Sequence, residues 1–233
     1  MQRVFGPDST SGFEAGSHLP RSAARVSSGE VLHLGAHLDR LRASAAFLGW
    51  DASWIEGEAM GLADWVRERT AEQAHALALR LHLRPRQLRA LLEPVPSTPS
   101  PYLLLPMPHP LGSPDADPRA PHKGLTGIWG AEARDRAQAA GAADAALHWA
   151  DGTLVETGIA SLGLQLDGSF WLPPAAGRIA SLAERLDLPP WAGSRGLRIG
   201  VRAFSVEEAA AGQLWCFNAL RGFWRAALVD PRR

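Results

Sequence analysis

A long stretch with few apolar residues divides this 233-residue chain near its middle. From Pro108 to Pro121 the sequence is mostly proline, glycine, serine and aspartate, residue types that interrupt helices and strands. Hydrophobic residues at helical or strand spacing occur on both sides of it. We therefore expect an interdomain linker at residues 108–122, between a small N-terminal domain, 1–107, and a larger domain, 123–233.

Regular hydrophobic spacings predict both strands and helices in the N-terminal half. Short strands at 23–26 and 31–34 flank the turn Ser27-Ser-Gly-Glu30, which indicates a hairpin. Leucine and alanine then recur at helical spacing from 38 to 48, and Gly49 stands where a helix ends. The other elements expected here are two helices between 56 and 83, the second opened by a capping box at Thr70–Gln73, and strands at 86–94 and 102–107.

The C-terminal half combines one long helix with many short strands. A helix is expected over 125–140, and Asp151-Gly152 and Asp167-Gly168 are typical of hairpin turns. Another helix is expected at 177–186, and a capping box at Ser205–Glu208 indicates a short third one. The strands predicted around them cover 145–149, 153–159, 162–166, 170–172, 197–204, 214–218 and 224–229. The two halves together predict an α+β protein.

Charge and cysteine content argue against several classes of function. The 24 acidic residues balance the 24 basic ones, so no net charge favours nucleic acid or an anionic membrane. Cys216 is the single cysteine and the eight histidines lack metal-ligand spacing, so we expect neither an intrachain disulfide nor a metal site. The N-terminus lacks the apolar core of a signal peptide, and no apolar run is long enough to span a membrane. We expect a soluble, cytoplasmic protein.

Lysine is almost absent from the chain, which draws attention to one position. Of the 24 lysines and arginines, 23 are arginines and one is Lys123, which follows the proline-rich stretch and precedes a predicted helix. Arginine cannot act as an amine nucleophile, because it does not lose its proton at ordinary pH. A coding bias toward arginine also explains a single residual lysine, so composition alone leaves the role of Lys123 open.

Three further segments carry residues that suit the binding of an anion or a basic ring. Arg40 lies at the edge of the buried face of the first helix, where it either binds an anion or pairs with Asp39 or Glu30. Glu156 lies in the middle of an apolar strand and either faces solvent or is buried with a partner. Gly177-Arg-Ile179 opens a predicted helix, whose backbone amides suit an anion.

Taken in order, these segments resemble the pyridoxal-phosphate enzymes of fold type IV. That family includes branched-chain and D-amino-acid aminotransferases and 4-amino-4-deoxychorismate lyase. The stretch Ala24 to Leu41 is similar to the family's hairpin and arginine-bearing helix. The segments around Lys123 and Glu156 follow at matching places, and Cys216-Phe-Asn-Ala-Leu-Arg-Gly222 is similar to the family's asparagine-containing strand end. The resemblance covers roughly residues 20–230.

The resemblance implies a fold, a cofactor and a set of residue roles. The fold is a two-domain fold type IV enzyme, α+β in class, with a small N-terminal α/β domain and a larger C-terminal domain built on a mostly antiparallel β core. The implied cofactor is pyridoxal 5′-phosphate (PLP). Lys123 falls on the catalytic Schiff-base lysine, Arg40 on a phosphate contact, and Glu156 on the glutamate that pairs with the pyridine nitrogen. The other implied contacts are Gly177, Arg178 and Ile179 for the cofactor, and Asn218 and Ala219 for the substrate.

Two activities and one binding role are compatible with the resemblance. The compact chain and the ending Asn218-Ala-Leu220 look more like the lyase, which forms 4-aminobenzoate and pyruvate for folate biosynthesis. A branched-chain or D-amino-acid aminotransferase of the same fold uses the same lysine. A non-catalytic homologue that binds a ligand or a partner is the third alternative, because Gly177-Arg-Ile-Ala180 lacks the hydroxyl of the family's usual Gly-(Ile/Val)-Thr-Arg. The resemblance also implies a small-molecule amino substrate and a homodimer.

Overall fold

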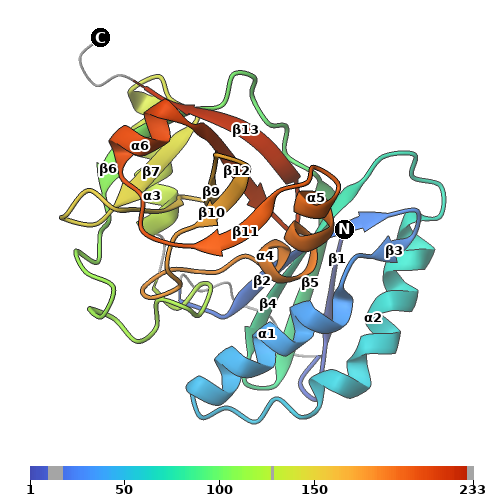
Figure 1. Cartoon of the computed structure of the whole chain (residues 1–233). Helices are drawn as coiled ribbons and strands as arrows, with labels where there is room; N and C mark the ends of the chain where they lie inside the picture. The colour runs from blue at the N-terminus through green and yellow to red at the C-terminus, as the bar shows by residue number, and fades with distance from the viewer. Residues whose placement is uncertain (10–17, 127–128, 230–233) are drawn as a thin grey trace. The chain divides into compact units, whose positions relative to one another are not determined.

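The chain forms two units, each with a sheet and helices of its own. The computed structural model describes residues 1–9, 18–126 and 129–229. Unit 1 holds Met1–Pro96 and His122–Gly127, and unit 2 holds Ser97–Pro121 and Ile128–Arg233. The elements of both are labelled in Figure 1, and they confirm the expected α+β class. No helix within the described ranges combines the length and the apolar character needed to cross a membrane.

Unit 1 is an antiparallel sheet with two helices. Its strands follow the order β1-β5-β4-β2-β3, and β2 and β3 form the hairpin expected around residues 27–30. The helix expected from residue 38 is also present, as α1. The elements are β1 (Gln2–Phe5), β2 (Arg21–Ser27), β3 (Glu30–Val31), α1 (Leu34–Phe47), α2 (Ile55–Thr70), β4 (Leu77–Arg84) and β5 (Gln87–Pro94).

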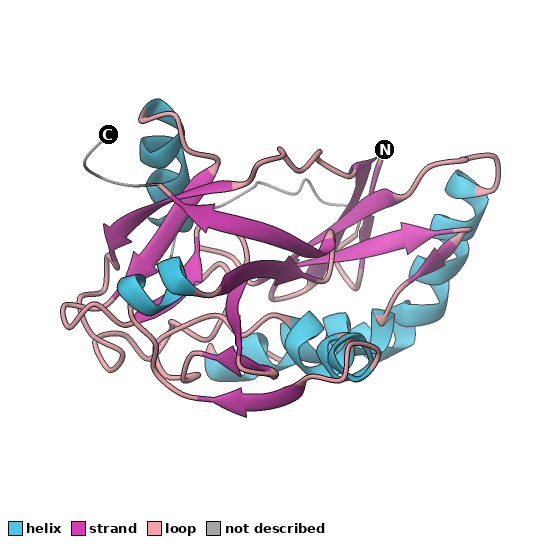
Figure 2. Ribbon diagram, turned by 45° about the horizontal axis from the view of Figure 1, so that its top comes forward, coloured by secondary structure: helices cyan, strands magenta, loops and turns pink. Residues whose placement is uncertain are grey.

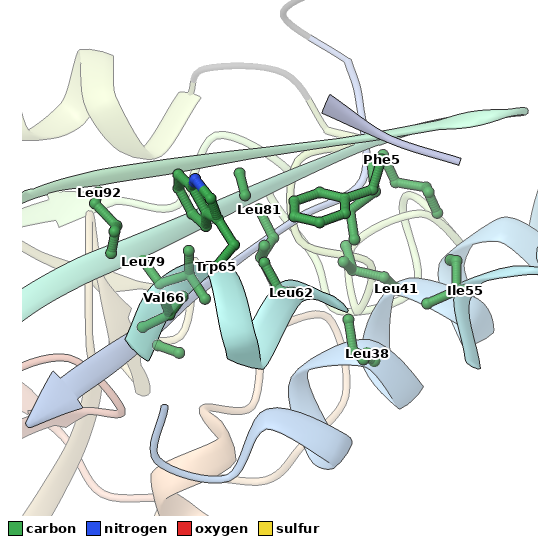
Figure 3. Close-up of a cluster of buried hydrophobic side chains, with 14 of the residues drawn as sticks. Phe5, Leu38, Leu41, Ile55, Leu62, Trp65, Val66, Leu79, Leu81 and Leu92 are labelled. Carbon is green, nitrogen blue, oxygen red and sulfur yellow. The ribbon is translucent and has the colours of Figure 1, made fainter. Parts of the chain in front are cut away.

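The core of unit 1 lies between the sheet and the two helices. Leu38 and Leu41 of α1 and Leu62 of α2 are buried, and in Figure 3 they point toward leucines of the sheet, among them Leu79 and Leu81. Each fully buried leucine contributes about 1.5–3 kcal/mol relative to an exposed one. This packing holds α1, and the residues on its other faces, in a fixed place on the sheet.

Two helices were expected between residues 56 and 83, and the prediction of the second one is wrong. Strand β4 forms there instead; its alternating leucines lie on one, buried face and its arginines and histidine on the other. This period of two is the signature of a strand, and it outweighs the capping-box pattern. Thr70 does not open a helix but ends α2, where its hydroxyl donates to the carbonyl of Val66 at 2.9 Å.

Unit 2 is built on a sheet that closes on itself. Its strands follow the order β11-β10-β9-β12-β13-β6-β7-β8, and β8 also pairs with β9, which closes a barrel. The strands can be followed in magenta in Figure 2. The elements are β6 (Leu103–Pro108), α3 (Trp129–Ala139), β7 (Asp144–His148), β8 (Leu154–Thr157), β9 (Ser161–Leu166), β10 (Ser169–Leu172), α4 (Leu182–Leu186), α5 (Leu188–Gly193), β11 (Arg198–Val201), α6 (Val206–Ala211), β12 (Gln213–Asn218) and β13 (Gly222–Leu228).

Several local predictions for unit 2 are confirmed. Asp167 and Gly168 both have positive φ, 49° and 69°, and connect β9 to β10 in a tight hairpin. Ser205 and Glu208 form the expected capping box at the start of α6. These turns and caps depend on residues adjacent in sequence, which is why the sequence alone identifies them.

The division between the units differs from the expected linker. Strand β6, expected in the N-terminal domain, pairs with β13 and β7 in the sheet of unit 2. The proline-rich stretch that follows also belongs to unit 2, and the backbone N–H of His109 donates to the carbonyl of His148 at 2.8 Å. The chain then returns to unit 1 at His122. Strand β6 is therefore paired along both of its edges within the sheet of unit 2.

Candidate functional site

Lys123 lies in a turn that belongs to unit 1, although the residues before it belong to unit 2. Its carbonyl accepts a hydrogen bond from the backbone N–H of Arg21, the first residue of β2, at 3.0 Å. The next residue, Gly124, has a φ of 100°, and a Cβ there would lie 2.1 Å from the carbonyl oxygen of Leu19. A glycine is required by both conformation and space. The turn therefore holds the half-buried Lys123 against the start of β2.

His122 fastens the same turn to α1. Its Nδ1 lies 3.1 Å from the hydroxyl oxygen of Ser44, and its ring stacks on Phe47 with the centroids 4.4 Å apart. Burial lowers the pKa of His122, which favours its neutral form. The segment that carries Lys123 is thus held by the sheet on one side and by α1 on the other.

A buried histidine of α1 lies near both Arg40 and Lys123. His37 precedes Arg40 by three residues, so the two share a helix face, and its Nδ1 lies 2.7 Å from the hydroxyl oxygen of Ser22 in β2. The pKa of His37 falls to about 3, first because burial penalises its charge and then because of the positive charges of Arg40, Lys123 and His33. A neutral imidazole therefore lies near several cations, which make a local positive potential in a chain of zero net charge.

Arg40 and Lys123 are predicted site residues that both lie in unit 1, and both of their charges lower the pKa of His37. Asp39, which was one alternative partner for Arg40, forms an ion pair with Arg42. Sequence reasoning did not identify His37, although its spacing from Arg40 on the predicted helix was a usable signal.

Glu156 is buried in unit 2, so the alternative that it faces solvent is excluded. It lies in β8 with 4% of its surface exposed, and its Oε1 accepts a hydrogen bond from the backbone N–H of Ile179 at 3.3 Å. The imidazole Nε2 of His109 lies 3.8 Å from the same oxygen. Burial raises the pKa of Glu156, while His109, the Ile179 N–H and the charge of Arg178 act in the opposite direction.

Arg178 is a buried part of the loop that holds Ile179. Its guanidinium forms a two-pronged ion pair with Glu184, at 2.5 and 2.9 Å, and donates to the carbonyls of Pro173 and Pro174, both at 3.0 Å. Only 2% of Arg178 is exposed. The side chain therefore fixes the path of the loop, and its donors are directed into unit 2 itself.

The helix expected to begin at Gly177 is wrong. Helix α4 begins at Leu182, after a capping box formed by Ser181 and Glu184, so the segment before it is a loop. Gly177 has a φ of 71°, and a Cβ there would lie 2.5 Å from the Cα of Pro114. The glycine lets the loop pack against the proline-rich stretch. The Ile179 amide therefore donates to Glu156 instead of lying at a helix N-terminus.

Asn218 and Ala219 lie where β12 turns into β13. The Asn218 side chain donates to the carbonyl of Ile159 at 3.3 Å and accepts the backbone N–H groups of Leu220 and Arg221 at 3.0 and 2.8 Å. The amide thus closes the turn, and both residues lie at the end of a barrel strand.

The two groups of side chains have complementary chemistry. In unit 1, a primary amine and a guanidinium lie near a neutral imidazole, a set that suits a carbonyl compound carrying a phosphate. In unit 2, the carboxylate of Glu156 lies 3.8 Å from the imidazole Nε2 of His109, so it suits the N–H group of a protonated heterocycle. Within the described ranges, the buried Nε2 atoms of His37 and His109 have no hydrogen-bond partner. The group in unit 1 therefore fits a phosphorylated aldehyde, and the group in unit 2 by itself fits a protonated pyridine ring.

Comparisons with known proteins agree with this chemistry. Residues 23–229 match the family described as amino-transferase class IV. A hypothetical aminotransferase from Mycobacterium tuberculosis, in its PLP-bound form, has a TM-score of 0.84 and 19% identity, covering 100% of this chain and 92% of that one. The sequence has no match among curated proteins.

Two further solved structures carry different activities on the same fold. The 4-amino-4-deoxychorismate lyase from Pseudomonas aeruginosa has a TM-score of 0.71 and 19% identity, covering 99% of this chain and 92% of that one. The branched-chain aminotransferase from Thermoproteus uzoniensis, with norvaline, has a TM-score of 0.74 and 16% identity, covering 91% and 78%. At these identities, the likeness establishes the expected fold type IV architecture.

Proposed function

Because the chain belongs to the class IV aminotransferase family, whose members are enzymes that use PLP, we propose that Lys123 is the residue that binds the cofactor covalently. One observation carries the proposal. The single lysine of the chain is fastened to the unit that contains Arg40, and both cations lie near the buried, neutral His37. An amine next to a phosphate-binding arginine is what a phosphorylated aldehyde requires.

Each of the three central residues has a distinct task in this proposal. When bound, PLP supplies a carbonyl for amine exchange and a ring that accepts electrons. Arg40 binds the phosphate through its guanidinium, and the neighbouring positive charge of Lys123 favours the anion. Lys123, once neutral, acts as a nucleophile and then as the base that moves a proton at the substrate carbon. The Glu156 carboxylate keeps the ring nitrogen protonated.

The loop that contains Gly177, Arg178 and Ile179 acts on the cofactor through Glu156. The Ile179 N–H donates to the carboxylate, and the buried ion pair of Arg178 with Glu184 keeps that amide in place. Gly177 allows the close approach to Pro114 that the loop path needs. In this proposal the three residues position the Glu156 carboxylate that pairs with the ring nitrogen of the cofactor.

For the reaction, we propose cleavage of aminodeoxychorismate to 4-aminobenzoate and pyruvate, a step of folate biosynthesis. The Asn218-Ala-Leu220 turn supports this choice, with Asn218 and Ala219 near the substrate. The alternative is an aminotransferase of branched-chain or D-amino acids, which the M. tuberculosis protein supports, since one of its forms binds α-ketoglutarate and PMP. In either case the substrate is a small amino compound, and we propose that the enzyme is a homodimer.

Cofactor capture tests the proposed role of Lys123. Purified protein mixed with PLP should turn yellow, and borohydride should then leave a phosphopyridoxyl group on the peptide that contains Lys123. The variant Lys123→Arg, which keeps the positive charge, should take up no covalent cofactor. Wild-type protein that stays colourless would overturn the assignment and favour the non-catalytic alternative.

The products distinguish the two reactions. A lyase releases pyruvate from aminodeoxychorismate without any added keto acid. An aminotransferase needs a keto acid in every cycle, so an obligatory requirement for one would rule out the lyase. The assay uses the same PLP-loaded protein, with Lys123→Arg as the blank.

A further inference from the structure

His109 occupies a fully enclosed position at the end of β6. Its ring lies between two of the chain's nine tryptophans, with centroid distances of 4.8 Å to Trp129 and 4.3 Å to Trp149. Its backbone N–H donates to His148, and its carbonyl accepts from Gly112 at 2.9 Å, which makes a turn. Both the backbone and the ring are therefore held in one orientation.

The hydrogen bonds of His109 determine which ring nitrogen carries the proton. The backbone N–H of Leu111 donates to Nδ1 at 3.2 Å, so in the neutral ring Nδ1 is the acceptor. The proton of the neutral imidazole is then on Nε2. This Nε2 is buried, and in the described part of the chain it has no hydrogen-bond partner.

The Nε2–H group lies close to the carboxylate of Glu156. Its distance to Oε1 is 3.8 Å, which is longer than a hydrogen bond, so the contact is electrostatic. Both side chains are almost completely buried, and in such surroundings a charge and an oriented dipole interact more strongly than in water. The same oxygen accepts a hydrogen bond from the backbone N–H of Ile179 in the loop before α4, so two N–H groups are near one carboxylate oxygen.

We propose that His109 is a positioning residue for Glu156, which uses its Nε2–H to fix the orientation and the negative charge of the carboxylate that meets the protonated ring nitrogen of PLP. This inference rests on the proposed function of Glu156. It is supported by the effect of His109 on Glu156, which lowers the pKa of the carboxyl against the effect of burial. The alternative is that His109 only fills space between the two tryptophans.

A pair of variants separates the two roles. Gln and Met have nearly the same size and shape, but only Gln has an N–H donor. With His109→Gln, PLP affinity should stay within about threefold of the wild type, whereas with His109→Met it should fall about tenfold. A residue that only fills space would make the two variants equivalent, and equal affinities would overturn the proposal.

A cofactor analogue shows whether the effect passes through Glu156. In the analogue, CH replaces the ring nitrogen, so no pyridinium meets the carboxylate. His109→Met and the wild type should bind this analogue with affinities that agree within about twofold. An equal loss for PLP and the analogue would overturn the positioning role while leaving the proposed function intact. Wild-type protein that binds neither compound would overturn the proposed function itself.

A measurement on the unmodified protein applies even if His109→Met does not fold. Nitrogen-15 NMR of the histidine rings distinguishes a protonated Nε2 from a protonated Nδ1. A neutral His109 ring with its proton on Nε2 is expected, and a proton on Nδ1 would overturn the proposal.

Discussion

Unit 1 and unit 2 each bury a histidine among their own candidate residues, and the two rings have opposite surroundings. His37 in unit 1 is held by the hydroxyl of Ser22 and lies near the positive charges of Arg40 and Lys123. His109 in unit 2 is held by a backbone N–H and lies next to the carboxylate of Glu156. The two rings are both buried and fixed by a hydrogen bond, yet one belongs to a cationic group and the other to an acidic one.

The difference shows that charge in this chain is organised locally. A net charge of zero removes the field of a net charge, but it does not prevent a positive group in one unit and a buried negative one in the other. The same residue type supports both, because the neighbours set its electrostatic role. Single substitutions can change either the cationic group or the acidic group and leave the other group intact.

The largest effect is expected from Lys123→Arg, which keeps the charge of the cationic group but removes its amine. Turnover should fall at least about 10³-fold, because the guanidinium cannot act as nucleophile or base. Steady-state kinetics with saturating PLP provides the measurement. The control is Arg119→Lys, which places a lysine at an exposed position four residues earlier in the sequence and should change turnover little. A Lys123→Arg variant with more than a tenth of normal turnover would contradict the assignment.

Arg178→Met removes the cation that supports the acidic group. Glu184 would keep a largely buried charge without its partner, which should lower the free energy of unfolding by about 3–5 kcal/mol. Urea denaturation of the purified protein measures the change. Arg202→Met is the matched control, since Arg202 pairs with Glu208 at a more exposed place and should cost less than about 1 kcal/mol. Equal losses in the free energy of unfolding of the two variants would show that the buried ion pair stabilises the fold no more than the exposed one.

His37→Gln tests the neutral ring of the cationic group through pH. The pKa of His37 is about 3 in the folded protein and 6.5 in the unfolded chain, so the unfolded state binds more protons between these values. The contribution that the lowered pKa of His37 makes to the free energy of unfolding is complete above pH 6.5, and it is lost as the pH falls toward 3. Between pH 7 and pH 5, the free energy of unfolding should therefore decrease by about 2 kcal/mol less in His37→Gln than in the wild type.

Ser22→Ala is the control for this pH effect. It removes the hydroxyl beside Nδ1 but leaves the buried imidazole near Arg40 and Lys123. The pH dependence should persist in Ser22→Ala, and its disappearance there would assign it to the hydrogen bond instead of to burial and charge.

The smallest effect is expected from Ser44→Ala, which removes one of the contacts that hold the lysine turn. The lost hydrogen bond to His122 should reduce stability by about 1 kcal/mol. Amide hydrogen exchange at residues 122–125 should become faster, and PLP affinity should fall only a few-fold. Unchanged exchange would show that Phe47 and the backbone alone hold the turn.

Features that depend on neighbours in sequence were predictable, and those that depend on distant partners were not. The turn at Asp167-Gly168 and the capping box at Ser205 follow from local chemistry, and both are confirmed. Lys123 stood out because of its rarity, and its place in unit 1 followed only from the structure.

His109, which sequence reasoning missed, depends on a three-dimensional contact. It gains its proposed role from Glu156, and the two residues belong to different strands or strand ends. No spacing rule predicts this pair, because it joins two elements that meet only after folding. Arg178 was predicted as a site residue, but its burial through the ion pair with Glu184 followed only from the structure. The sequence indicated correctly that Gly177 allows a close approach of the backbone, but it predicted the wrong partner. The glycine is required by its contact with Pro114 and not by the start of a helix.

The return of the chain to unit 1 at His122 has a consequence for how this protein can be inherited or rearranged. The segment 1–96 contains Arg40 and His37 but not the lysine that lies near them, which is encoded after the first part of unit 2. A gene fusion or recombination at residue 96 would therefore separate the amine from its arginine. The smallest contiguous piece that carries both also carries β6 and the proline-rich stretch, so an exchange of the first 96 residues alone cannot transfer both.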